Sequence, residues 1–196
     1  MSGCGGGQQQ DAKEPKGNFP LRVLSASFPA KQNLAKTSNM QIVVENAGRR
    51  TVPNVNVTVK CGSKIGGSFS TATQDVDVAD PRRPQFVVNT IPTATPRHAP
   101  PLDPAPLERS SAFVDTYPLG ALAPGRQATF RWNVTAVKAG PYSLCWRIQA
   151  GLFGKARAVR AAGSRPLRGV FRGKISNKAP KATIAANGHT VIDSSR

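Results

Sequence analysis

Acidic residues are almost absent from the second half of this chain of 196 residues. Residues 1–115 hold thirteen Lys or Arg and nine Asp or Glu, whereas residues 116–196 hold fourteen Lys or Arg and one acidic residue, Asp193. Such a cationic block attracts anionic polymers, anionic membrane surfaces and acidic proteins without choosing among them. Because no sequence-specific nucleic-acid-binding motif accompanies it, nucleic acid is the least expected partner, although the charge alone leaves it open.

Histidines and catalytic motifs are equally scarce. Neither His98 nor His189 has a carboxylate or a cysteine at the spacing of a zinc site or a catalytic triad. A nucleophile elbow, a phosphate-binding loop and a dinucleotide-binding fingerprint are all missing. Asp75, Asp77 and Asp80 are spaced like the start of a calcium loop, but the glycine and closing glutamate of an EF-hand do not follow. The sequence therefore predicts a protein that is not an enzyme and uses no cofactor or metal.

Long hydrophobic runs are missing as well, and no stretch approaches the ~18 apolar residues of a membrane-spanning helix. The start of the chain, Ser2-Gly3-Cys4-Gly5, resembles the end of a bacterial lipobox, in which a small residue and glycine precede the cysteine that receives lipid. The match covers three or four residues, and the apolar segment of a complete signal does not precede it. The resemblance implies lipidation at Cys4, residues 1–18 as a disordered tether, and an extracytoplasmic, membrane-anchored protein. The alternative is a free cysteine in a flexible tail.

Two strongly alternating segments lie in the basic half of the chain. After the turn at Pro124-Gly125, apolar residues occupy every second position of residues 128–134, and the same pattern returns in residues 142–148. Period-two alternation is typical of half-buried strands, and the short connection predicts an antiparallel pair. Trp132 and Trp146 lie on the apolar sides and are expected in the core.

A second hairpin is predicted from residues 38–61, with a break at Asn46-Ala47-Gly48. Together these motifs resemble the cell-adhesion-related domain of bacterial surface proteins, which has an immunoglobulin-like fold. The matching residues are Val44, Asn46 and Gly48 at a strand end, the V-x-V-x-V strand of residues 55–59, L-A-P-G at 122–125 and A-G-x-Y-x-L at 139–144. They cover about 90 residues and specify fold far better than function.

The resemblance implies an all-β protein, an immunoglobulin-like antiparallel β-sandwich over residues 19–178 with an insertion at 62–111. Six prolines within residues 92–106 make part of that insertion an exposed loop, and the segment 85–91 is expected to form a short strand. Asn187-Gly188 predicts a hairpin within a C-terminal segment of residues 179–196.

In such a sandwich Cys61 and Cys145 lie on neighbouring strands, so the resemblance implies a disulfide between them. Closing a loop of about 85 residues would stabilise the fold by roughly 4 kcal/mol. Alternation, however, places Cys61 on the inward side of its strand, with the valines, and Cys145 on the outward side of its strand, away from the aromatics. A direct bridge therefore needs a bulge or twist. Two separate thiols remain the alternative.

Several arginines and lysines near the C-terminus form the surface most expected to bind an anionic partner. Arg168, Arg172 and Lys174 share an outer face if no bulge interrupts the strand, although a charge run is more often only solvated. We expect a non-enzymatic, envelope-associated binding or adhesion module that contacts an anionic envelope polymer or a partner protein. The alternative is a structural accessory subunit of a secreted or envelope assembly. The predicted binding residues are Arg157, Arg160, Arg165, Arg168, Arg172 and Lys174.

Overall fold

The computed structural model of the chain describes residues 14–59, 84–93, 115–178, 182–184 and 191–193. Its strands are β1 (Gly17–Ser27), β2 (Lys31–Asn33), β3 (Thr37–Asn46), β4 (Asn56–Val59), β5 (Phe86–Thr90), β6 (Thr116–Pro118), β7 (Gln127–Ala136), β8 (Gly140–Gln149), β9 (Ala156–Arg160), β10 (Arg168–Ser176), β11 (Ala182–Ile184) and β12 (Val191–Asp193). Within these ranges there is no helix, and hence none that could cross a membrane.

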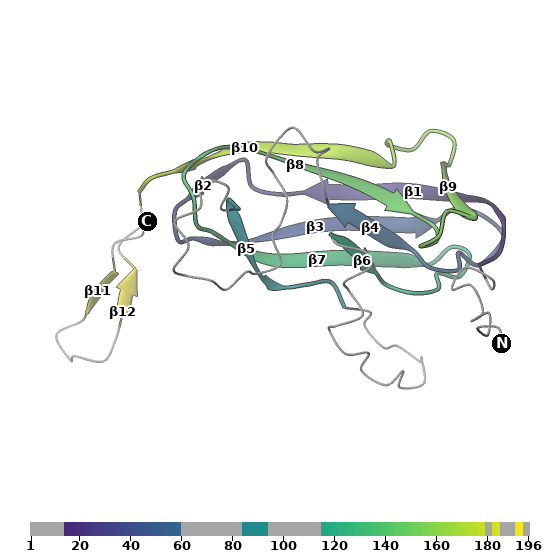
Figure 1. The fold of residues 1–196 in the computed structure, drawn as a ribbon, viewed down its shortest axis with the longest axis horizontal. Coiled ribbons are helices and arrows are strands. Elements are labelled where there is room, and N and C mark those ends of the chain that lie inside the picture. The colour runs from purple at the N-terminus through teal and green to yellow at the C-terminus, as the bar shows by residue number, and fades with distance from the viewer. Residues whose placement is uncertain (1–13, 60–83, 94–114, 179–181, 185–190, 194–196) are drawn as a thin grey trace, which may run out of the picture.

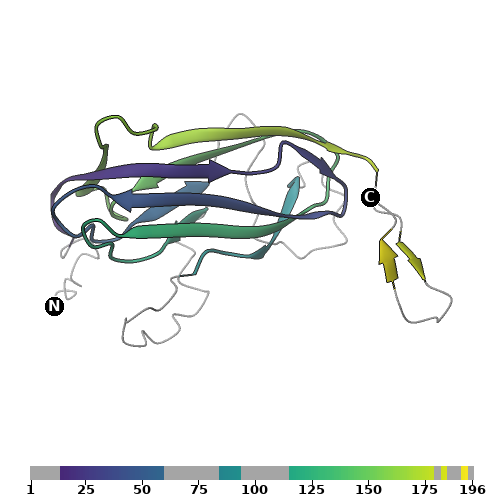
Figure 2. The same cartoon turned by 180° about the vertical axis from the view of Figure 1, so that it is seen from behind.

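Ten of the strands form two five-stranded sheets that pack face to face (Figures 1 and 2). The first sheet has the order β5-β7-β3-β1-β9, and the second has the order β2-β10-β8-β4-β6. Strands β11 and β12 pair with each other, antiparallel, on either side of the Asn187-Gly188 signal. The predicted all-β, immunoglobulin-like sandwich is therefore confirmed. It is mostly antiparallel, but β9 runs parallel to β1 and β2 runs parallel to β10.

Both predicted hairpins are wrong in their pairing. Strand β7 lies in the first sheet and β8 in the second, and β3 and β4 are divided in the same way. Strand β7 pairs with β3 and β8 pairs with β10. Alternation shows which side of a strand faces the core, and two strands that face each other across a core alternate just as two neighbours do. The short connections are arches between sheets.

The core is the space between the two sheets. Trp132, Phe130 and Met40 are fully buried, and Trp146 is 7% exposed, so both tryptophans are core residues as expected. Phe86 is also buried, which means that the segment between residues 62 and 111 contributes an edge strand, β5, to the first sheet. Apart from residues 84–93, the insertion lies outside the described residues.

Order begins earlier than the expected end of a tether at residue 18. Strand β1 starts at Gly17, where it pairs with Ala156. Before it, the Glu14 carboxylate accepts hydrogen bonds from the backbone N–H groups of Lys155 at 2.7 Å and Phe153 at 3.1 Å. Hydrogen bonds to a charged acceptor are stronger than neutral ones. Glu14 thus clamps the start of the described chain to the turn between β8 and β9.

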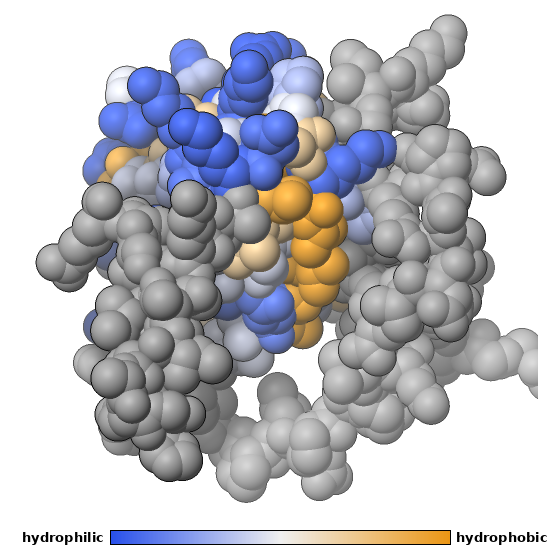
Figure 3. Space-filling model, turned by 90° about the vertical axis from the view of Figure 1, so that its left-hand side faces the viewer, coloured by the Kyte–Doolittle hydropathy of each residue, from blue (hydrophilic) through white to orange (hydrophobic). Residues whose placement is uncertain are grey.

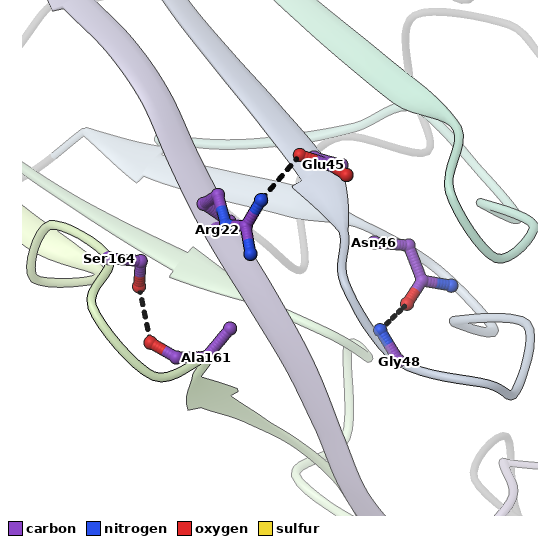
Figure 4. A network of polar contacts seen from close by, with 6 residues as sticks. All are labelled: Arg22, Glu45, Asn46, Gly48, Ala161 and Ser164. Carbon is purple, nitrogen blue, oxygen red and sulfur yellow. Dashed lines mark hydrogen bonds and ion pairs between the residues drawn. The ribbon is translucent and has the colours of Figure 1, made fainter.

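The fully buried side chain of Asn46 holds together the loops at the same end of the sandwich (Figure 4). Its Nδ2 donates to the carbonyl oxygens of Arg50 and Leu122, both at 2.8 Å, and its Oδ1 accepts the N–H of Gly48 at 3.0 Å. Leu122 is 76 residues away along the chain. The asparagine of the V-x-N-x-G motif therefore satisfies three backbone groups from two loops.

Tyr117 gives the fold a predictable response to alkaline pH. Burial, and then the charge of Asp115, raise the pKa of Tyr117 to about 12. An unfolded tyrosine ionises near pH 10, so the neutral phenol stabilises the folded state fully below about pH 10 and loses that effect as pH rises towards 12. We expect the free energy of unfolding of the Tyr117→Phe variant to fall less between about pH 9 and 11, measured by urea denaturation. Equal losses in both proteins would contradict this, since Tyr142 is common to them.

Candidate functional site

Strand β10 presents its cations on one side. Arg168, Arg172 and Lys174 are exposed at alternate positions, and the pairing with β8 runs without a register shift. The predicted common outer face of these three residues is therefore confirmed.

Two further cations join them from neighbouring strands. Arg147 of β8 lies directly opposite Arg168, and Lys31 of β2 lies beside Lys174. Both side chains are exposed. We call these five residues, Lys31, Arg147, Arg168, Arg172 and Lys174, the basic face. Figure 3 looks at the end of the molecule that carries β2 and shows hydrophilic residues over its upper part.

The described acidic side chains lie elsewhere. Glu14 binds the turn between β8 and β9, Asp115 is buried, and Glu45 forms an ion pair with Arg22 at 3.5 Å on the first sheet (Figure 4). Thus no carboxylate among the acidic side chains that the structure describes neutralises the basic face. Positive charges on one face without counter-charges raise the local concentration of anions.

Two glycines let β10 lie close to the core. A Cβ at Gly169 would be 2.5 Å from the ring of Trp146, and a Cβ at Gly173 would be 2.1 Å from the Ala30 carbonyl oxygen. Both distances are far below van der Waals contact, so neither position has room for a side chain. The three cations of β10 that flank these glycines therefore project from a strand that is packed directly on the buried rings of Trp146 and Tyr142.

The other predicted binding residues lie away from this face. Arg157 and Arg160 are on β9, which belongs to the first sheet, and Arg165 lies in the turn that leads to β10. The predicted set is thus divided between the two sheets. Sequence reasoning did not include Arg147, which joins the face only through the pairing of β8 with β10. It did not include Lys31 either, because β2 is too short to show a pattern.

Cys61, the predicted disulfide partner of Cys145, lies outside the described residues, as does Cys4. Cys145 is half-buried on the outer side of β8, between the basic residues of the face. Strand β4 ends at Val59, which lies opposite Trp146, the neighbour of Cys145. The chain therefore leaves β4 next to Cys145, two residues before Cys61.

No catalytic or metal site emerges in the ranges that the structure covers, which hold no group of three His, Cys, Asp or Glu placed to bind a metal. His98, His189 and the three aspartates at residues 75–80 lie outside these ranges. The candidate site is therefore the basic face.

Comparison with known proteins shows no family for this chain. No protein-family model matches the chain, and no curated protein matches it. Among solved structures, the CARDB domain of the PF1109 protein from Pyrococcus furiosus, in complex with di-metal ions, matches with a TM-score of 0.44 and 14% identity over 82% of this chain and 96% of that one. A fragment of Escherichia coli alpha-2-macroglobulin matches with a TM-score of 0.42 and 13% identity over 82% of this chain.

This chain spans only 17% of that macroglobulin fragment. The ASH/PapD-like domain of human CEP192 matches with a TM-score of 0.34 and 12% identity, over 93% of this chain and 99% of that one. Likenesses at this level carry no argument about partners or chemistry. The immunoglobulin-like sandwich rests on the strand order and packing of the chain itself, and its function has to be inferred from the basic face.

Proposed function

We propose that the protein is a non-enzymatic binding module that holds an anionic partner against the basic face. The observation that supports this is the arrangement of five exposed cations on adjacent strands β2, β10 and β8, with no described carboxylate among them. The platform is rigid because β10 packs on Trp146 and Tyr142 through its glycines. A rigid array loses little conformational entropy on binding.

Salt dependence tests this proposal. Displacing counterions from an array of about five cations makes affinity fall on the order of 100-fold between about 50 and 200 mM salt. We expect a fluorescein-labelled inorganic polyphosphate to show this loss in fluorescence anisotropy with the purified chain. Absence of binding at the lower salt concentration, or an affinity that does not change with salt, would count against the basic face as an anion site.

We further propose that the module acts at the cell envelope, held by lipid on Cys4 and stapled by a Cys61–Cys145 bridge. The position of Cys145 next to the end of β4 supports the bridge. The Glu14 clamp supports a tether that ends at a defined point of the sandwich. Because the alternate valines of β4 point inward and Cys145 lies on the outer side of β8, the bridge requires a twist in the chain after Val59.

Intact mass of the protein isolated from its native cells tests this setting. We expect a diacylglycerol-sized increment on an N-terminal Cys4, together with a non-reduced peptide that joins Cys61 to Cys145. A soluble, unmodified protein with separate thiols would remove both the anchor and the bridge. Recovery in the membrane fraction without lipid would contradict only the anchor.

An accessory subunit of an envelope assembly is the second candidate. Val137, the residue directly after β7, is 45% exposed, and Val87 of β5, the strand that pairs with β7, is 37% exposed. This apolar pair lies on the sheet that does not carry the basic face. A partner bound there would resist salt, so its binding would differ from that of the polyphosphate in the same titration.

A further inference from the structure

Strand β10 has an open edge over most of its length. On one side it pairs with β8 from Arg168 to Ile175, but on the other side β2 covers only Lys174 to Ser176. Residues 168–173 have no neighbouring strand on that side within the part of the chain that the structure describes. An edge of this kind offers unpaired N–H and C=O groups to an incoming strand.

The edge of β10 is open because the segment that precedes β2 belongs to the other sheet and does not run beside β10. Strand β2 approaches β10 only after Pro29, whose carbonyl accepts a hydrogen bond from Gln32 at 3.0 Å and another from the Tyr142 hydroxyl. Before Pro29 the chain belongs to β1, in the other sheet. Because the chain crosses from the first sheet to the second at this point, Ala30 is the first residue of the segment that pairs with the edge of β10.

The direction of the free backbone groups follows from two hydrogen bonds. The N–H of Lys174 donates to Ala30 on the open side of β10, whereas the Leu167 carbonyl accepts the N–H of Ile148 on the β8 side. In an antiparallel ladder the direction of these groups alternates from residue to residue. The N–H and C=O groups of Arg168, Val170 and Arg172 therefore point towards the open edge.

The same three residues turn their side chains to the outer face. Arg168 and Arg172 are part of the basic face, and Val170 between them is 40% exposed. The inward side carries Gly169 and Gly173, which leave no pocket because Trp146 and Tyr142 fill the space. β10 would therefore recognise an added strand through backbone hydrogen bonds and through the charges on the outer face of that strand.

We propose that residues 168–173 of β10 take up an extended acidic segment of a partner protein as an additional strand. The segment would exchange backbone hydrogen bonds with Arg168, Val170 and Arg172 and place carboxylates beside the two arginines. This inference rests on the proposed anion-binding function and narrows its partner from any polyanion to an acidic polypeptide in the β conformation. Backbone pairing supplies affinity in such complexes, and alternate side chains supply specificity.

The test uses the full-length chain and a capped peptide of about eight residues in which glutamate alternates with threonine. Threonine favours the strand conformation, and glutamate can form opposite-charge pairs with the arginines across the edge. Two N-methylated forms of the peptide are compared. In one form the amides of the odd-numbered residues are methylated, and in the other form those of the even-numbered residues are methylated. A strand bound through one edge tolerates methylation of its outer amides only, so we expect one form to bind like the parent and the other to lose at least about 10-fold in affinity. Equal binding of both forms would show attraction by charge alone and overturn the proposal.

Amide hydrogen exchange gives a readout at the residues concerned. We expect the parent peptide, but not inorganic polyphosphate, to slow exchange of the Arg168, Val170 and Arg172 amides. The Val170→Pro variant removes the central donor without touching the β8 ladder, so it should lose peptide affinity and retain polyphosphate affinity, whereas Val170→Ala should retain both. If Val170→Pro fails to fold, the two methylated peptides and the exchange data decide.

The outcomes separate this inference from the proposed function. Polyphosphate binding without peptide binding would overturn strand addition and leave the anion-binding face intact. Slow exchange of the three amides in the chain alone would show that another part of the chain already occupies the edge, which also overturns the inference. Failure of both probes would remove the proposed function and the inference together.

Discussion

Replacing Asn46 with alanine should lower the free energy of unfolding by about 3 kcal/mol or more. The change leaves the buried Leu122 carbonyl and the partly buried Arg50 carbonyl without the amide that donates to them, and it leaves the Gly48 N–H without its acceptor. Each unsatisfied buried polar group costs about 1–3 kcal/mol, reduced where water can enter. Urea denaturation at neutral pH measures the difference.

The matched control lies on the same strand. Asn39 of β3 is exposed, and its Oδ1 accepts one hydrogen bond from Asn133 across the outer side of the sheet. We expect Asn39→Ala to cost no more than about 0.5 kcal/mol, as is usual at the surface. Similar losses in the two variants would mean that the buried amide of Asn46 does not hold the loops together.

Removing three cations from the basic face should weaken polyphosphate binding on the order of 100-fold at low salt. An exposed cation beside an anionic surface contributes about 1 kcal/mol, so the triple replacement of Arg147, Arg168 and Arg172 by serine removes about 3 kcal/mol. The logarithmic dependence of affinity on salt should become shallower as well, because fewer counterions are displaced. Anisotropy titrations at two salt concentrations measure both effects.

A second triple variant removes the same charge elsewhere. Arg49 and Arg126 lie in loops and Arg131 lies on the outer side of the first sheet, and all three are exposed. Their replacement by serine gives a protein with the same net charge as the first variant. We expect it to retain most of the affinity. Equal losses would show that the protein attracts polyanions through its overall charge and has no defined site.

Alternation predicted the buried faces of this protein well. The apolar sides of β7 and β8 are buried throughout, including Trp132 and Trp146, and the edge strand β5 lies where a short strand was expected. Burial of alternate residues is a local consequence of strand geometry, so one segment at a time suffices to predict it.

The pairing of the strands and the full set of residues in the basic face could not be predicted from single segments of the sequence. Strands β2 and β9 are only three and five residues long, and neither shows an alternating apolar pattern. The neighbours Arg147 and Arg168 are brought together only when β8 and β10 pair, 21 positions apart. The sequence showed Asn46 as part of a motif at a strand end. Its hydrogen bond to the Leu122 carbonyl could not be predicted, because Leu122 is 76 residues away and approaches Asn46 only in the folded sandwich.

The parallel pairing of β1 with β9 has a mechanical consequence. Strand β1 begins at the end of the sandwich where Glu14 is clamped, and β10 finishes at the opposite end (Figure 1). A pull between these two points acts along the strands, so the hydrogen bonds that β1 makes with β3 and β9 must break together and not one after another. A domain built in this manner withstands stretching along its long axis far better than peeling from its sides.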